Sequence, residues 1–74
     1  YLDEAIHWWL QEHKLTQSYL ARVMGRPEKT ISEIMSRKSR VTAQTAKELQ
    51  HVTGINAEFL LKLQINLDLD KLRL

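Results

Sequence analysis

Four polar residues near the middle of the chain have types and spacing that suit hydrogen bonding to the edges of base pairs. They are Lys29, Ser32, Glu33 and Ser36. In a helix that advances about 100° per residue, they share the side opposite Ile31 and Ile34. Lysine can donate to guanine acceptors, glutamate can accept from the cytosine amino group, and serine can do either. The pattern therefore predicts a surface that could read bases in a major groove.

Residues that suit contacts with phosphate lie on both sides of this surface. The expected phosphate contacts are Gln17, Thr30, Arg37, Lys38 and Arg40. Arginine and lysine neutralise phosphates, which fixes the register of a protein on a nucleic acid without reading its sequence. Gln17 is expected at the first position of a helix, where free backbone N–H groups also favour an anion. Alternatively, Gln17 is only a polar residue on the surface and contacts no phosphate.

Positive charge is concentrated around these residues. Residues 22–40 contain six basic and two acidic side chains, a net charge of +4, whereas the whole chain carries +2 and the remainder −2. A polyanion would bind such a face. The same pattern also occurs on solvated basic surfaces that bind nothing.

Two short helices joined by a tight turn would have to position these side chains. They are expected over residues 17–24 and 28–35. Leu20 and Ala21 face inward, and Ala21 is small where the second helix must approach closely. Gly25 can adopt the left-handed conformation that ends a helix. The spacing predicts a helix-turn-helix.

Three further helices are expected over residues 2–13, 43–53 and 57–70. In the first of these, apolar residues recur at helical spacing and place Trp9 on the inward stripe. Trp8 is expected either at the edge of the core or against another subunit.

The last expected helix carries two apolar stripes. One consists of Phe59, Leu60, Leu63 and Leu67, and the other of Leu61, Ile65, Leu69 and Leu72. A terminal helix on a small domain needs only one buried face, so the first stripe is expected on the core and the second on a partner. A two-fold homodimer would supply that partner. The alternative is a tail that folds back and buries both stripes.

Length and composition narrow the function classes. The 74 residues suffice for one domain with one modest core, and the chain has no cysteine for a disulfide or a zinc finger. Its three histidines lack the spacing of metal ligands, and no nucleophile–base pair or phosphate-binding glycine loop is present. We therefore expect no enzyme activity, cofactor or metal, no membrane partner and a cytoplasmic location. Because the chain begins at Tyr1, residues are expected to be missing upstream.

Several short motifs carry a resemblance to a known superfamily. They are Leu15-Thr16-Gln17, Leu20-Ala21, Gly25, Thr30-Ile31-Ser32-Glu33-Ile34, Val41-Thr42 with Thr45-Ala46, and Ala57-Glu58-Phe59-Leu60-Leu61 followed by Leu63-Gln64. Over most of its length the chain resembles the helix-turn-helix domains of phage repressors and Cro, and within that superfamily it is most similar to HigA-type antitoxins. It departs from the HigA pattern at Ser36-Arg37-Lys38, where Asn-Gly-Lys is common, and at Leu60, where Trp is frequent.

The resemblance implies an all-α, five-helix, lambda-repressor-like domain that dimerises and binds double-stranded DNA at a palindromic operator. It also implies an antitoxin that neutralises a small ribonuclease toxin and represses its own operon in a bacterium or phage. Carried over by position, Gln17 would contact phosphate, and Lys29, Ser32 and Glu33 would face bases. The alternative is mainly a protein-interaction module, either a toxin-neutralising antitoxin or the first domain of a larger stress-response protein, with DNA binding secondary.

Overall fold

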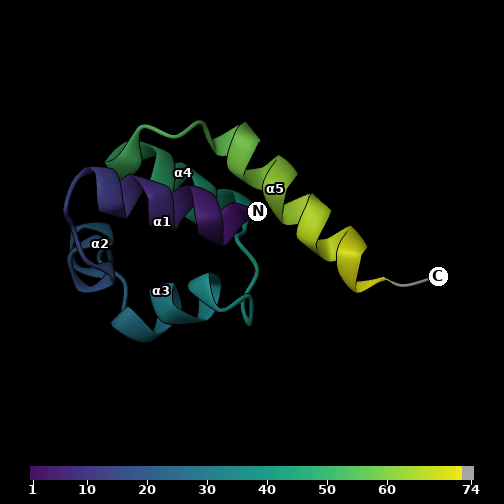
Figure 1. Ribbon diagram of the computed structural model, residues 1–74, viewed down its shortest axis with the longest axis horizontal. Helices are drawn as coiled ribbons and strands as arrows, with labels where there is room; N and C mark the ends of the chain where they lie inside the picture. The colour runs from purple at the N-terminus through teal and green to yellow at the C-terminus, as the bar shows by residue number, and fades with distance from the viewer. Residues whose placement is uncertain (73–74) are drawn as a thin grey trace.

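The described part of the chain, residues 1–72 of a computed structural model, consists of helices and their connections without a β-strand (Figure 1). The helices are α1 (Leu2–Glu12), α2 (Gln17–Met24), α3 (Glu28–Met35), α4 (Ala43–Thr53) and α5 (Ala57–Lys71). This confirms the all-α, five-helix architecture expected from the sequence. The bounds of α2, α3 and α4 are those expected, whereas α1 ends one residue earlier and α5 one residue later than expected.

Side-chain caps and glycines explain where several helices begin and end. The hydroxyl of Thr16 and the hydroxyl of Thr42 accept backbone N–H bonds at the starts of α2 and α4. The Asn56 side chain does the same for α5. Each cap satisfies one of the N–H groups that a first turn leaves without an intrahelical partner. Gly25 and Gly54 follow α2 and α4 with φ of 68° and 78°, the left-handed conformation that favours glycine.

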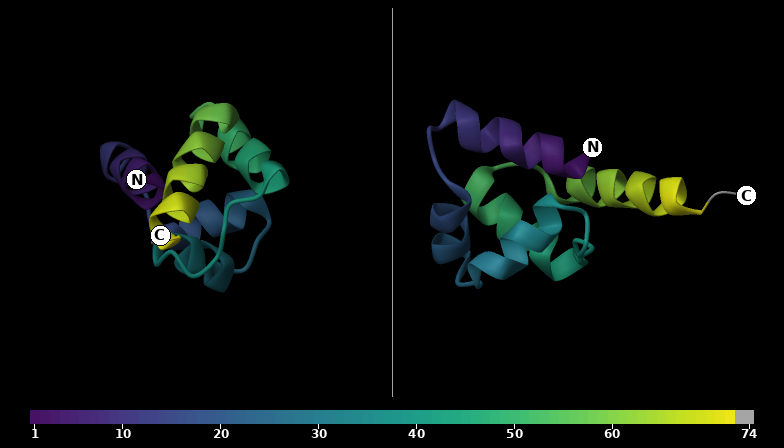
Figure 2. Two further views of the ribbon diagram at one scale, coloured as in Figure 1. Left: turned by 90° about the vertical axis from the view of Figure 1, so that its right-hand side faces the viewer. Right: turned by 60° about the horizontal axis from the view of Figure 1, so that its bottom comes forward.

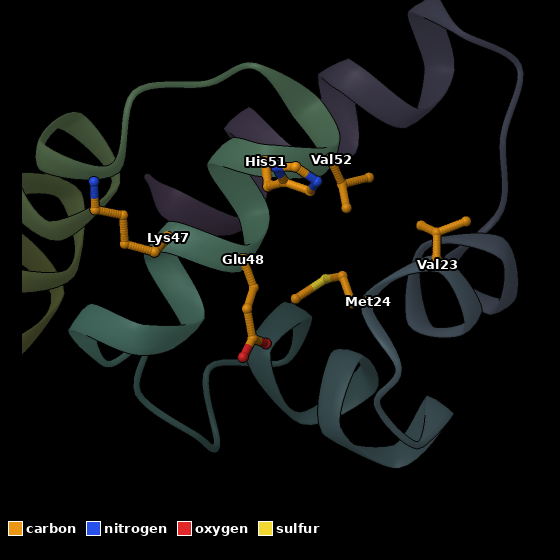
Figure 3. Close-up of a pocket in the computed structure, with 6 residues that line it drawn as sticks. All are labelled: Val23, Met24, Lys47, Glu48, His51 and Val52. Carbon is orange, nitrogen blue, oxygen red and sulfur yellow. The ribbon is translucent and has the colours of Figure 1, made fainter.

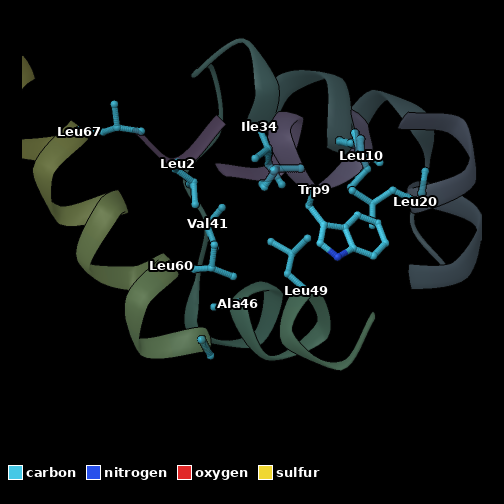
Figure 4. Packing of buried hydrophobic residues seen from close by; sticks show 14 residues of the cluster. Leu2, Trp9, Leu10, Leu20, Ile34, Val41, Ala46, Leu49, Leu60 and Leu67 are labelled. Carbon is cyan, nitrogen blue, oxygen red and sulfur yellow. The ribbon is translucent and has the colours of Figure 1, made fainter. Parts of the chain in front are cut away.

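A single apolar core joins all five helices (Figure 4). Its largest fully buried side chains are Leu2, Ile6, Leu20, Ile31, Leu49, Leu60 and Val41. Trp9 is buried in this core, as its position in the α1 stripe predicts. The neighbouring Trp8 is 59% exposed and covers little of the core. Burial of this continuous apolar surface is what holds the short helices together, since helices of 8–11 residues are marginal in isolation.

The helices form a small body from which α5 projects. Helix α3 packs against α1 and α2, and α4 packs against α2 and α5. The second half of α5 extends away from this body (Figures 1 and 2), which gives the molecule a long dimension of 39 Å against 22 Å in the other two. No helix within residues 1–72 is long and apolar enough to cross a bilayer.

The buried face of α5 differs in part from the expected stripe. Leu60 and Leu67 are buried as expected, but the expected core residue Phe59 is 49% exposed. Gln64 shares the buried face instead, because positions i, i+4 and i+7 lie on one side of a helix, whereas Phe59 is turned about 100° from Leu60. Leu61, expected on the partner face, is half-buried against the core. Both placements are corrections to the sequence prediction.

Candidate nucleic-acid interface

The outer face of α3 presents the polar side chains that the sequence singled out. Ile31 and Ile34 are buried and fix which side of α3 faces the core. On the opposite side, Lys29, Ser32 and Ser36 are exposed, and the Lys29 side chain retains 86% of its accessible surface. The face has the size and polarity of an element that can enter a major groove.

Glu33 is more constrained than its expected role suggests. One carboxylate oxygen lies 3.8 Å from the Lys29 ammonium, and the other accepts a hydrogen bond from the Ser39 hydroxyl at 3.0 Å. The Glu33 carbonyl also accepts from the backbone N–H groups of Lys38 and Ser39. Ser36 donates its hydroxyl to the same carbonyl at 3.3 Å. Glu33 therefore lies next to the exposed face of α3 and also links the end of α3 to the loop that follows.

A polar hollow of about 330 Å³ lies between the first turns of α2 and α3. Thr16, Tyr19, Arg22 and Arg26 contribute to its lining. The guanidinium of Arg22 lies 5.7 Å from the centre of the Tyr19 ring, within cation–π distance. Gln17 is exposed at the start of α2 beside these residues. Arg22 belongs to the basic cluster at residues 22–40, but neither Arg22 nor Tyr19 is among the contacts expected from the sequence. Their i,i+3 spacing on a helix indicates that the two side chains meet.

Thr30, an expected phosphate contact, is half-buried in the first turn of α3. Its backbone N–H donates to the carbonyl of Pro27 at 3.0 Å. This bond closes the turn that leads into α3. Thr30 is less accessible than Lys29 beside it.

The loop Ser36–Arg40 does not present all its basic side chains freely. Arg37 donates to both carboxylate oxygens of Asp3 at 3.1 and 3.4 Å and lies 4.4 Å from the centre of the Tyr1 ring. The hydrogen bond to Asp3 raises the pKa of the Arg37 guanidinium. Arg37 also has a φ of 65°, so it adopts the left-handed conformation at the position where HigA-type chains commonly have glycine.

Arg40 is paired in the same way on the other side of the loop. Its Nε and Nη2 donate to the carboxylate of Asp68 on α5, with the shortest distance 2.6 Å. Asp68 also accepts from Gln64 Nε2 at 2.9 Å. The hydrogen bond from Arg40, followed by that from Gln64, holds the pKa of Asp68 below its ordinary value. Lys38, between the two paired arginines, is exposed and forms no ion pair with any residue from 1 to 72.

A second hollow, of about 280 Å³, lies between α2 and α4 (Figure 3). Val23, Met24 and Val52 form its apolar part, and Lys47 and His51 lie at its polar margin. The sequence predicts no function for this region. Its apolar lining differs from the polar lining of the hollow at the starts of α2 and α3.

The expected partner face on α5 is largely accessible. Ile65, Leu69 and Leu72 are 53%, 60% and 66% exposed. Ile65 and Leu69 lie in the second half of α5, and Leu72 is the C-cap that follows its last residue. Together with the half-buried Leu61 they form one apolar side of the helix, separate from the buried Leu60 and Leu67.

Most of this architecture lies within the part of the chain that matches a known protein family. A family model described as helix-turn-helix (HTH_3) matches residues 6–60, which is more than half of the chain and includes α2, α3 and α4. No curated protein matches the chain.

Proposed function

Since the chain belongs to the helix-turn-helix family HTH_3 and is a DNA-binding transcription regulator, we propose that it is a homodimeric repressor of the antitoxin type, which binds a palindromic operator through α3. The observation that carries this proposal is the exposed polar face of α3 over its buried isoleucines. Lys29, Ser32 and Ser36 would face base edges. Gln17 at the start of α2 and Lys38 after α3 would contact phosphates on either side.

The proposed dimer uses the projecting half of α5. Ile65 and Leu69 on that helix, and Leu72 at its C-cap, each expose more than half of their surface. Exposed aliphatic side chains in a row favour burial against a complementary surface. A second copy presents the same row, and a two-fold pair of such domains would place two α3 helices toward successive major grooves.

The antitoxin role is supported by the resemblance of the segment after Arg40 to HigA-type chains. In that role the same protein would bind and neutralise a small ribonuclease and would repress the operon that encodes both. A second candidate, a protein-interaction module with secondary DNA binding, is favoured by the amount of exposed apolar surface. Trp8 and Phe59 are about half exposed in addition to the α5 face.

Selection of binding sites from a random duplex pool at near-physiological salt tests the DNA-binding part. We expect enrichment of a two-fold symmetric site whose half-sites are about one helical turn apart. Matched selection with the Lys29→Ala variant should enrich a different sequence. Weak binding without enrichment, together with strong salt dependence, would favour the interaction-module alternative.

The antitoxin part is tested by the genes beside the selected operator. The product of the adjacent gene should cleave RNA when expressed alone, and addition of this protein should suppress the cleavage. An Ile65→Asp variant distinguishes operator binding from ribonuclease suppression. It should weaken operator binding, because it disrupts the dimer. An adjacent product without ribonuclease activity would leave a repressor that is not an antitoxin.

A further inference from the structure

We propose that Arg40 is a positioning residue and not a phosphate contact: Asp68 and Gln64 of α5 hold Arg40 and the backbone after it, so that Lys38 meets the DNA phosphate from a fixed loop. The proposal rests on the proposed function, because it assumes that α3 lies in a major groove. It replaces the sequence expectation that Arg40 itself neutralises a phosphate.

A continuous set of hydrogen bonds runs from α5 to the loop. Gln64 is 3% exposed, and its Oε1 accepts from the backbone N–H of Val41 at 2.8 Å. Its Nε2 donates to Asp68, which in turn accepts from Arg40. A buried amide whose two ends are both paired costs free energy if either partner is lost. The backbone just after Arg40 is therefore tied to α5 by a buried contact as well as by an ion pair.

The charges favour Lys38 over Arg40 as the phosphate contact. The guanidinium of Arg40 is already matched by both oxygens of Asp68, the geometry in which arginine–carboxylate pairs are strongest. If Arg40 moved to a phosphate, the Asp68 carboxylate would be left unpaired near a polyanion. Lys38 is exposed without an ion-pair partner within residues 1–72, and its backbone N–H is held by the Glu33 carbonyl at 2.8 Å.

One alternative uses the same contacts differently. Asp68 could occupy the place of a phosphate in the free protein and release Arg40 when DNA binds. The two readings predict opposite effects of removing Asp68. If Arg40 is a positioning residue, the loss of Asp68 lowers the affinity for DNA. If Asp68 competes with a phosphate for Arg40, the loss of Asp68 raises that affinity.

The test measures operator affinity between about 50 and 200 mM salt, because each neutralised phosphate adds about 0.9 to the slope of log K against log salt. The central variant is Arg40→Gln/Asp68→Asn, which removes the pair without changing the net charge. We expect affinity to fall about twofold to tenfold at every salt concentration with the slope unchanged. Lys38→Ala is the matched comparison, and its slope should become shallower by about 1.8, which is about 0.9 for the lysine in each half-site.

Two further variants keep the result interpretable. Gln64→Leu changes no charge and should also lower affinity at constant slope. The exchanged pair Arg40→Asp/Asp68→Arg should recover affinity relative to Arg40→Asp alone, since it rebuilds the ion pair in reverse. Circular dichroism melts identify any variant that does not fold, and the remaining variants then decide the question.

A slope made shallower by about 1.8 in Arg40→Gln/Asp68→Asn, which is about 0.9 for each half-site, or a higher affinity in Asp68→Asn, would overturn the proposal. So would failure of the exchanged pair to recover any affinity while it remains folded. Failure of the proposed function is distinguishable, because the unmodified protein would then enrich no symmetric site.

Discussion

The guanidinium of Arg26, in the turn between α2 and α3, donates to both carboxylate oxygens of Glu48 on α4 at 2.9 and 2.8 Å. This pair connects the turn of the helix-turn-helix to a helix that does not take part in the motif. Both side chains are partly exposed, so their contribution to stability is modest. Their main consequence is that α4 fixes the turn from which α3 begins.

We expect Arg26→Ala and Glu48→Gln each to lower the midpoint of thermal unfolding slightly. Each change removes one partner of the bidentate pair and leaves the other without it. Arg26→Lys should fall between these variants and the unmodified protein, because lysine keeps the charge but cannot form the two-pronged contact. Circular dichroism at 222 nm gives the midpoints, with the exposed Lys47→Ala as a control that should leave them unchanged.

Lys29→Ala should change which DNA sequence is preferred. A lysine that donates to guanine acceptors contributes about 1–3 kcal/mol of discrimination at its base pair. The loss should therefore be confined to operators that carry guanine at one position. Competition binding with single-base operator variants measures it, and Lys38→Ala provides the contrast of a loss shared by all sequences. An equal loss on every operator would show that Lys29 contacts only the backbone.

Ile65→Asp should yield a folded monomer. Ile65 is 53% exposed, so the change should alter the free energy of unfolding of the monomer by no more than about 0.5 kcal/mol. Leu61 belongs to the same expected partner stripe, but Leu61→Asp should cost about 2 kcal/mol, because Leu61 packs against the core. Sedimentation equilibrium and urea unfolding separate the two effects. A dimer that persists in both Ile65→Asp and Leu69→Asp would place the interface elsewhere.

Arg37→Gly should be more stable than Arg37→Ala by about 1 kcal/mol, the backbone cost of the left-handed conformation for a residue with a Cβ atom. Both variants lose the contacts with Asp3 and Tyr1, so their difference isolates the backbone at φ 65°. Urea unfolding of the two proteins under identical conditions measures it. Equal stabilities would indicate that the loop adopts another conformation once the arginine is removed.

Acidification should remove a part of the stability that Asp68 and Glu48 provide. Hydrogen bonds from Arg40 and Arg26 respectively lower the pKa of these carboxyl groups in the folded protein from ordinary values of 3.8 and 4.5. A lowered folded-state pKa contributes stability that is complete above the ordinary value and is lost as the pH falls through the lowered one. Unfolding midpoints should therefore be steady from about pH 7 to 5 and decline below about pH 4. The Asp68→Asn/Glu48→Gln variant should show a shallower decline over the same range.

Local physical chemistry made much of the fold accessible from the sequence. Thr16, Thr42 and Asn56 cap helices that begin where those residues stand, and Gly25 and Gly54 end helices for the same local reason. The alternation of buried and exposed residues in α3 follows from its own period, so the placement of Ile31 and Ile34 opposite Lys29 and Ser32 could be predicted.

The rotation of α5 about its axis could not be predicted in the same way. Phe59 and Leu61 are both apolar neighbours of Leu60, and the sequence offers no reason to prefer one over the other beside the core. The packing of α5 against α1 and α4 decided that Phe59 is exposed, Leu61 half-buried and Gln64 buried. When a helix has apolar residues on two sides, the sequence shows that either side could be buried. It does not show which side packs against the other helices.

The helix-turn-helix, its caps, its inward residues and its basic charge can be predicted from the sequence, because each depends on residues within one or two helical turns of each other. Which basic side chains of the loop Ser36–Arg40 remain unpaired depends instead on tertiary packing. Arg37 meets Asp3 and Arg40 meets Asp68 across 34 and 28 residues of chain, and pairs so distant in sequence form only where packing of α1 and α5 brings their carboxylates to the loop. Lys38 is left exposed between them for that reason.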